Sequence, residues 1–293
     1  MTVKDYIDEL SRRFESAEIF FGHGTANARD EACYLVFASL GLSWDDYAAE
    51  MQKEIAAENL DVLETKARVR IEQRVPTAYL TGVAWFAGFP FRSDERALVP
   101  RSPIAELLEN RLDPLLEAEP RKILDLCCGG GCIGIAAALI FPDASVDLAD
   151  ISADALELAG ENVALHELDD RARLVSSNLF QGLSATCYDL VLCNPPYVGD
   201  AEYKSLPTEF NHEPEMGLVS QQNGLEIPLR ILHQAADYLS DQGILVMEVG
   251  DSCQALSERC PGVPFLWLEF EHGGEGVFML TRSQLLEYRE RFI

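Results

Sequence analysis

Residues 123–134 read ILDLCCGGGCIG and hold the strongest fold signal in the chain. A short apolar run that enters consecutive glycines is typical of a β-strand that turns tightly into a helix. Glycine lets a ligand approach the backbone, and a helix N-terminus favours polar or negative groups. The stretch fits a plain strand-to-helix turn and, through Gly129, Gly131 and Gly134, the fingerprint of dinucleotide-binding proteins.

Short apolar runs alternate with helical segments beyond this turn. The runs are residues 122–126, 146–150, 172–176, 189–193 and 244–249. Such alternation predicts an α/β, Rossmann-like fold in which helices cover a mostly parallel sheet. Phe265–Phe270 and Gly276–Thr281 are joined by a glycine-containing turn, so we expect an antiparallel C-terminal hairpin at the sheet edge.

The N-terminal part has a different pattern. Apolar residues at helical spacing, such as Tyr6, Leu10 and Phe14, predict a small helical domain over residues 1–84. Residues 85–100 are aromatic and extended, with Gly88 and Pro90, and predict a hairpin linker. Residues 101–293 are expected to form the catalytic domain, opening with a helix from Pro103 to about Leu116.

The composition is that of a globular protein with a strong acidic excess. The chain has 49 Asp and Glu against 23 Lys and Arg, a net charge of -26. This charge disfavours free nucleic acid as a substrate. It either attracts basic proteins or serves solubility alone, and the charge by itself favours the second reading. There is no apolar run long enough for a membrane span and no secretory signal pattern, so we expect a cytoplasmic protein. Its eight cysteines are expected to be reduced thiols, and their spacing predicts no metal site.

Two carboxylates favour a nucleoside ligand over a dinucleotide. Asp125 lies at the end of the first strand of this sheet, and Asp150 ends the next strand, where it can bind both ribose hydroxyls of an adenosyl group. A pyrophosphate near Asp125 would bring like charges together. An adenosyl group that carries methionine fits both acids.

The fourth strand runs into Asn194, Pro195, Pro196 and Tyr197. Proline fixes its own φ and restricts the preceding residue to extended geometry, so this loop is rigid. The Asn194 side-chain oxygen and the Pro195 carbonyl can then accept both N–H bonds of one planar NH2 group. These acceptors would align the nitrogen with a sulfonium methyl and stabilise the positive charge that develops, while Tyr197 walls the pocket.

These motifs resemble the HemK-like N(5)-glutamine methyltransferases, whose hallmark is the Asn-Pro-Pro-Tyr loop. The resemblance covers nearly the whole chain, including His212–Leu218 after the loop. The segment Pro100–Leu107 and the tail Phe265–Phe278 are similar to the PrmB branch, which acts on a glutamine of ribosomal large-subunit protein three. The resemblance implies a class I S-adenosylmethionine methyltransferase fold and a basic ribosomal protein as substrate.

Site residues carried over from the resemblance fall on matching positions. The implied cofactor contacts are Asp125, Leu126, Cys127, Cys128, Gly129, Gly131, Asp150, Asn178, Leu179 and Asn194. The implied catalytic residues are Asn194, Pro195, Pro196 and Tyr197. Asn178 replaces the family's usual Asp, and Cys128 and Gly130 replace the usual Thr and Ser.

Four alternatives stay open at this point. The same loop suits a nucleic-acid amino-group methyltransferase, although the acidic charge opposes it. The peptide release factor branch differs in the Pro100–Leu107 segment. A nicotinamide-dependent oxidoreductase fits the glycines but leaves Asn194–Tyr197 without a role. An assembly factor without turnover would not need an intact loop. The roles of His212 and Glu213 are open between a lid over the site and a surface turn.

Overall fold

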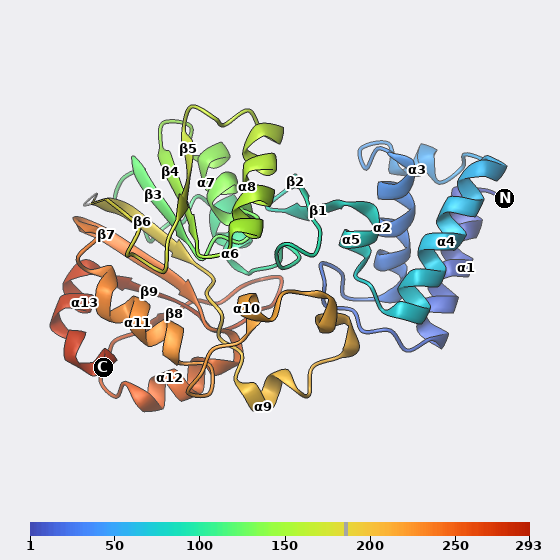
Figure 1. The fold of residues 1–293 in the computed structure, drawn as a ribbon. Helices are drawn as coiled ribbons and strands as arrows, with labels where there is room; N and C mark the ends of the chain where they lie inside the picture. The colour runs from blue at the N-terminus through green and yellow to red at the C-terminus, as the bar shows by residue number, and fades with distance from the viewer. Residues whose placement is uncertain (185–186) are drawn as a thin grey trace.

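The fold is seen in a computed structural model that describes residues 1–184 and 187–293. Figure 1 shows a group of N-terminal helices on one side, a sheet flanked by helices on the other, and a small hairpin between them. The two chain termini lie at opposite ends of the molecule (Figure 1).

The N-terminal helices pack around their own apolar core. They are α1 (Val3–Ser16), α2 (Ala28–Leu40), α3 (Tyr47–Glu50), α4 (Ala57–Gln73) and α5 (Thr77–Thr81). Thr2 and Asp5 form a capping box at the start of α1, and the Asn27 side chain accepts a hydrogen bond from Asp30 N to cap α2. Gly41 ends α2 in the left-handed conformation, at φ 63°.

A two-stranded hairpin follows the helices. Strands β1 (Val83–Phe86) and β2 (Phe89–Arg92) pair antiparallel, as the aromatic pattern predicted. The Tyr34 hydroxyl of α2 donates to the Val83 carbonyl, so the hairpin is tied to the N-terminal helices.

The sheet has the strand order β5-β4-β3-β6-β7-β9-β8. Its strands are β3 (Lys122–Leu126), β4 (Ser145–Asp150), β5 (Ala172–Ser176), β6 (Tyr188–Cys193), β7 (Leu239–Glu248), β8 (Leu266–Trp267) and β9 (Val277–Thr281). Strands β3 to β7 run parallel, whereas β9 pairs antiparallel with both β7 and β8. The predicted antiparallel hairpin therefore lies at the sheet edge, with a first strand shorter than expected.

Successive side chains along each central strand enter cores on opposite faces of the sheet. Ile123 belongs to the core that α6, α7 and α8 cover, whereas Leu124 belongs to the core under α11, α12 and α13. The helices on the first face are α6 (Ile104–Glu109), α7 (Cys132–Ile140) and α8 (Ala153–Leu165); those on the second are α11 (Glu226–Ala235), α12 (Cys253–Arg259) and α13 (Arg282–Glu287). Burial on both faces explains why these strands are almost continuously apolar.

Short helices fill the remaining connections. They are α9 (Asp200–Tyr203), α10 (Glu215–Leu218) and the 3-10 helices η1 (Thr208–His212), η2 (Gly250–Ser252) and η3 (Arg289–Phe292). No helix in the described ranges is both long and apolar enough to cross a bilayer.

The predicted extent of the helix after Pro103 is wrong. Helix α6 ends at Glu109 instead of continuing to Leu116, because Arg111 and Leu112 take positive φ angles of 55° and 53°. The turn directs Leu112 into the core, where its side chain is fully buried. Burial of Leu112 outweighs the strain of a non-glycine residue at positive φ, which a sequence pattern does not reveal.

Gly134 provides a test of the packing between α7 and the sheet. A Cβ at Gly134 would lie 2.3 Å from Leu148 Cδ2 and 2.7 Å from Asp125 Cβ. We expect Gly134→Ala to lower the free energy of unfolding by about 1–3 kcal/mol, because the core has no room for the added methyl group. Urea unfolding measures this change.

Gly160→Ala in α8 is the matched control. Its Cβ would meet only Leu174 Cδ1, at 3.1 Å, and the Leu174 side chain is exposed and can move aside. This variant should stay within about 1 kcal/mol of the parent, since alanine also favours the helix. Equal stability of the two variants would contradict the packing described here.

Candidate active site

A cavity of about 610 Å³ lies where the carboxyl ends of the central strands meet. Strands β4 and β5 extend from β3 in one direction, whereas β7 and β9 extend from β6 in the other. The gap between the ends of β3 and β6 is thus the point at which the strand order reverses, where open α/β sheets bind ligands. The volume falls within the range of about 300–1,000 Å³ that is usual for small-molecule sites.

The glycine turn after β3 forms one wall of the cavity. Cys127, Cys128 and Gly129, to which the resemblance assigns cofactor contacts, line it. Cys127 and Gly129 have φ angles of 61° and 54°, so the chain reverses within a few residues and exposes its backbone to the cavity. Burial raises the pKa of the Cys128 thiol well above its ordinary value, so it stays protonated at neutral pH.

Asp125 lies beneath this turn, outside the cavity lining. Its side chain is fully buried, and Oδ2 accepts a hydrogen bond of 2.7 Å from Gly134 N. Burial raises the pKa of Asp125 to about 7, although the Gly134 bond opposes the shift. In this geometry Asp125 supports the turn from below, and its Oδ1, which has no partner among the described residues, remains available.

Asp150 reaches the cavity from the end of β4. Its Oδ2 accepts from Gly129 N and its Oδ1 from Ser152 N, both at 2.9 Å. These backbone bonds fix the carboxylate at the cavity wall and connect it to the glycine turn. A carboxylate oxygen has more than one acceptor position, so each can still receive a hydroxyl donor from a ligand.

Four other residues predicted to contact the cofactor are not part of the cavity lining. Leu126 and Leu179 are buried in the core, and Gly131 caps α7 and packs against Ala159. Asn178 is exposed, and its Oδ1 accepts a 3.3 Å hydrogen bond from Arg230. Their cofactor contacts remain predictions that come from the resemblance alone.

The loop after β6 forms the opposite wall. Asn194, Pro195, Pro196 and Tyr197 all line the cavity, so the structure brings the predicted catalytic residues together with Asp150 and the glycine turn. In the part of the chain that the structure describes, no hydrogen bond reaches the Asn194 side chain or the Pro195 carbonyl. Both acceptors are therefore free to bind a donor in the cavity.

A buried ion pair holds the segment that precedes α6. Arg101 donates to both carboxylate oxygens of Glu213, at 2.6 and 2.7 Å, and Val99 N donates to Oε1 at 2.8 Å. Burial would raise the pKa of Glu213, but the charge of Arg101 and the contact with His23 outweigh it and lower the pKa to about 2. Glu213 is thus a buried anchor below the cavity wall, neither a lid nor a surface turn, while His212 contacts the Gln73 carbonyl at 2.7 Å.

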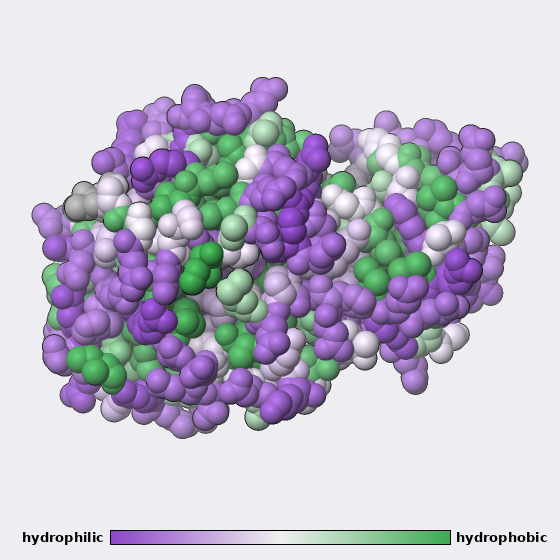
Figure 2. All heavy atoms as spheres, in the orientation of Figure 1, coloured by the Kyte–Doolittle hydropathy of each residue, from purple (hydrophilic) through white to green (hydrophobic). Residues whose placement is uncertain are grey.

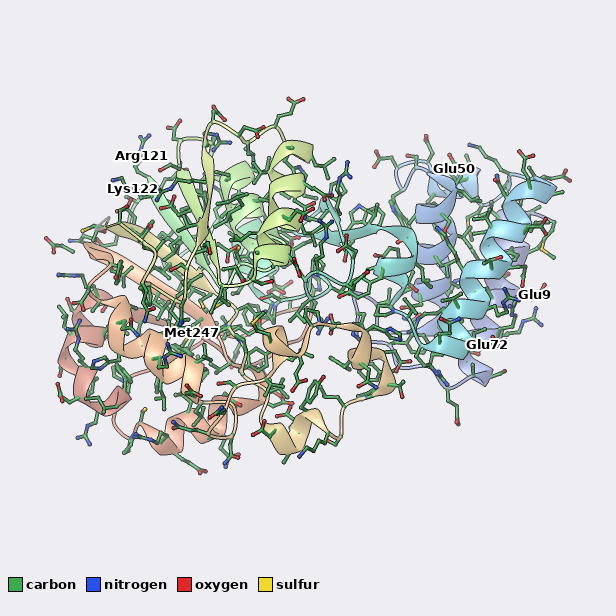
Figure 3. All side chains as sticks on the ribbon, in the orientation of Figure 1. Glu9, Glu50, Glu72, Arg121, Lys122 and Met247 are labelled. Atoms are coloured by element: carbon green, nitrogen blue, oxygen red, sulfur yellow. The ribbon has the colours of Figure 1, made fainter. Side chains whose placement is uncertain are left out.

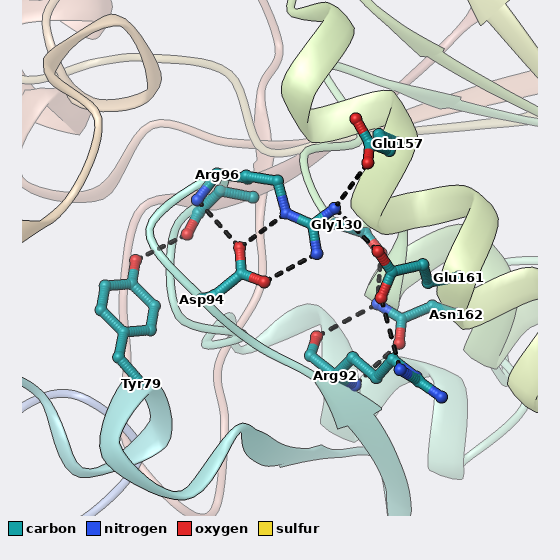
Figure 4. Close-up of polar contacts among 9 residues, drawn as sticks. Tyr79, Arg92, Asp94, Arg96, Gly130, Glu157, Glu161 and Asn162 are labelled. Atoms are coloured by element: carbon teal, nitrogen blue, oxygen red, sulfur yellow. Dashed lines mark hydrogen bonds and ion pairs between the residues drawn. The ribbon is translucent and has the colours of Figure 1, made fainter.

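Polar contacts also fix the segment between the hairpin and the cavity (Figure 4). Arg96, which lines the cavity, pairs with Asp94 at 2.7 Å and with Glu161 of α8 at 2.8 Å. The Asn162 amide donates to the Gly130 carbonyl at 2.9 Å, so α8 is connected to the glycine turn as well. The linker and the turn are therefore held relative to each other through α8.

Glu248 and Ser102 are site residues that the sequence reasoning missed. Both line the cavity, and they are hydrogen-bonded to each other at 2.5 Å. Glu248 ends β7 in the same way that Asp150 ends β4. The rule that selected Asp150, an acid at the carboxyl end of a parallel strand, could have selected Glu248 too.

Comparison with known proteins identifies the fold. A sequence profile of the methyltransferase small domain matches residues 105–218. The structure is similar to the hMettl16 catalytic domain solved in complex with MAT2A 3'UTR hairpin 6, with a TM-score of 0.53 and 18% identity over 77% of this chain and 82% of that chain. The predicted class I S-adenosylmethionine methyltransferase fold is confirmed, with S-adenosylmethionine as its cofactor.

Two curated relatives identify the family. The ribosomal protein uL3 glutamine methyltransferase of Neisseria meningitidis serogroup A is 44% identical over 288 residues, covering 97% of this chain and 94% of the relative. The protein of the same name from Francisella tularensis subsp. tularensis is 39% identical over 293 residues, covering 99% and 93%. The predicted family is confirmed: this chain belongs to the ribosomal protein uL3 glutamine methyltransferases.

Proposed function

We propose that the enzyme transfers a methyl group from S-adenosylmethionine to the side-chain amide nitrogen of a glutamine in ribosomal protein uL3, in the cytoplasm. The relatives' names supply the substrate. The observation that carries the chemistry is the pair of free acceptors, Asn194 Oδ1 and the Pro195 carbonyl, on the wall of a cavity that also holds Asp150. Neither a dehydrogenase nor a plain binding protein needs two such acceptors.

The residues around the cavity fit the methyl donor. Asp150 would bind the ribose hydroxyls, and the exposed backbone of Cys127–Gly129 would lie along the donor's methionine part. The ends of β3 and β6 are adjacent in the sheet, so a donor bound on the glycine turn has Asn194 beside it. Bound there, S-adenosylmethionine supplies an electrophilic methyl group on a sulfonium sulfur.

Asn194 and Pro195 would prepare the amide nitrogen for attack. The lone pair of an amide is delocalised into its carbonyl group, so the nitrogen is a poor nucleophile unless it is held in the geometry of the transition state. Two fixed acceptors hold both N–H bonds, direct the nitrogen toward the methyl group and stabilise the charge that develops on it. The methylated nitrogen is strongly acidic and loses its proton without a dedicated base.

The charge of the enzyme supports a basic protein substrate. The net charge is -26, and Glu202, Asp251 and Glu275 are acids at the cavity. Figure 2 shows a largely hydrophilic face with separate hydrophobic patches, and Figure 3 shows Glu9 and Glu72 on the outside of the N-terminal helices. Arg121 and Lys122 lie at the amino end of β3, the end of the strand away from the cavity (Figure 3). The negative electrostatic field of such a surface speeds the encounter with a basic protein and repels free nucleic acid.

The N-terminal helices, residues 1–84, are proposed to bind the folded part of the substrate beside the glutamine. This proposal is supported by direct contacts between the N-terminal helices and the segment after the catalytic loop. Glu209 in this segment accepts from Phe20 N at 2.9 Å and from the buried Arg70 at 3.3 Å, and Glu213 contacts His23 at 3.2 Å. A substrate held by these helices would therefore be placed at a fixed position relative to the cavity.

A methyl-transfer assay tests the proposed substrate. The enzyme is incubated with radiolabelled S-adenosylmethionine and, in parallel, with unmodified uL3, a peptide release factor, or ribosomal RNA. Label on a glutamine of uL3, located by peptide mass spectrometry, is the expected result. Label on the release factor or the RNA, with none on uL3, would contradict the proposal.

Asn194→Ala tests the acceptor role. The variant should lose at least about two orders of magnitude in kcat, since one fixed acceptor in the transition state is removed. Calorimetry should show cofactor binding largely retained. Asn110→Ala at the exposed C-terminal end of α6, outside the cavity lining, is the control for the substitution itself and should have normal activity. Normal methylation by Asn194→Ala would refute the mechanism.

Asp150→Ala tests the placement of the cofactor. Loss of a carboxylate that binds two hydroxyl groups should weaken S-adenosylmethionine binding roughly 10- to 100-fold in a calorimetric titration. Asp147→Ala on the same strand is the matched control, because Asp147 binds Tyr188 and Arg173 and does not line the cavity. Equal affinities in the two variants would exclude the ribose assignment.

A further inference from the structure

Glu248 lies on the side of the cavity away from the proposed cofactor contacts. The strand order places β4 and β3, with Asp150 and the glycine turn, on one side of β6, and β7, which ends at Glu248, on the other. Glu248 is thus two strands, or about 10 Å, from the end of β3. With the cofactor on the glycine turn, as proposed, a buried carboxylate at this position would face the substrate.

Each carboxylate oxygen of Glu248 accepts one hydroxyl donor. The Tyr197 hydroxyl donates to Oε1 at 2.7 Å, and the Ser102 hydroxyl donates to Oε2 at 2.5 Å. Tyr197 comes from the catalytic loop, whereas Ser102 comes from the segment before α6 and also accepts from Ile104 N at 3.1 Å. One carboxylate therefore fixes two separate segments of the cavity wall.

The backbone of Tyr197 is fixed independently of Glu248. The Ser252 hydroxyl donates to the Tyr197 carbonyl at 2.9 Å. A Cβ at Gly250 would lie 2.6 Å from Tyr197 Cε2, so the ring edge lies directly against the glycine backbone. The main chain is thus held and one ring edge meets Gly250, whereas the hydroxyl end of the ring is held by Glu248.

Burial raises the pKa of both partners. Burial and the charge of Glu248 raise the pKa of Tyr197 well above its ordinary value, so the phenol keeps its proton and donates. Burial also raises the pKa of Glu248, whereas the two hydroxyl donors and the charge of Arg101 oppose this shift. The donors that Glu248 fixes thus reduce, without cancelling, the rise in pKa that burial causes.

We propose that Glu248 is a positioning residue for methyl transfer: through the Tyr197 hydroxyl it sets the orientation of the tyrosine ring that confines the glutamine amide against Asn194. This inference rests on the proposed function. Glu248 itself is not expected to touch the methyl donor or the reacting nitrogen. Its effect should therefore appear in turnover and be absent from cofactor binding.

The thermal stability of a Glu248 variant distinguishes a positioning role of Glu248 from a purely structural one. A buried glutamate whose pKa is raised on folding contributes most below the pKa of the unfolded state, and its contribution falls as pH rises through the folded pKa. Above the folded pKa the buried charge therefore opposes folding. Glu248→Gln removes this charge at nearly constant volume, so the thermal midpoint should be no lower than that of the parent.

The experiment measures kcat and KM on uL3, cofactor affinity and thermal midpoint for Glu248→Gln, Tyr197→Phe and the double variant. Each single variant should lose roughly 10- to 100-fold in kcat, as expected for one hydrogen bond to a charged group. The double variant should be no slower than the slower single variant, because both substitutions remove the same bond. The cofactor affinity should be unchanged.

Asp147→Asn is the matched control, because Asp147 also accepts a tyrosine hydroxyl, that of Tyr188 at 2.6 Å, but lies outside the cavity lining, so kcat should be unchanged. Three outcomes would each overturn the inference. The first is full activity of Glu248→Gln, and the second is additive losses in the double variant. The third is a loss of activity that only follows a loss of thermal stability. The parent enzyme in the same assay separates the two proposals. A parent inactive on uL3 refutes the proposed function, whereas an active parent with an equally active Glu248→Gln refutes only the role of Glu248.

Discussion

Two hydrogen-bond acceptors lie at the end of β6: the Asn194 side-chain oxygen and the Pro195 carbonyl. Neither accepts a hydrogen bond from another of the described residues. Proline geometry keeps the backbone that carries them in place, because Pro195 and Pro196 fix their own φ and restrict the residues before them. The strand order places them beside the glycine turn, where the methyl donor is proposed to bind. A planar NH2 group can donate one hydrogen bond to each of these two acceptors. The family of the chain indicates that this group is the side-chain amide of a glutamine.

Buried carboxylates keep the wall around these acceptors in position. Glu213 anchors Arg101 and Val99, Glu209 binds Arg70, and Glu248 holds Tyr197 and Ser102. Each receives several hydrogen bonds, as a buried charge requires. Because Glu209 and Glu213 also contact residues near α1 and α4, the N-terminal helices and the cavity are mechanically connected. An acidic protein thus uses part of its charge inside the fold and part of it on the surface.

Much of the fold could be predicted because its signals are local. The strands β3 and β5 have the predicted bounds, and the glycine turn and the Asn194–Tyr197 loop line the cavity as expected. The early end of α6 could not be predicted, since it depends on the burial of Leu112 in a core formed by distant residues. Glu213 could not be assigned either, because its partners His23, Val99 and Arg101 are more than a hundred residues away in sequence. Local patterns thus locate the strand ends, whereas the partners of a buried charge depend on the complete fold.

A crystal structure of the enzyme with S-adenosylhomocysteine and a glutamine-containing uL3 fragment tests the central claim most directly. The claim predicts the glutamine amide nitrogen within about 2.7–3.2 Å of both Asn194 Oδ1 and the Pro195 carbonyl, with the cofactor sulfur in line beyond it. A glutamine bound elsewhere in the cavity, or a cofactor sulfur directed away from Asn194, would contradict it.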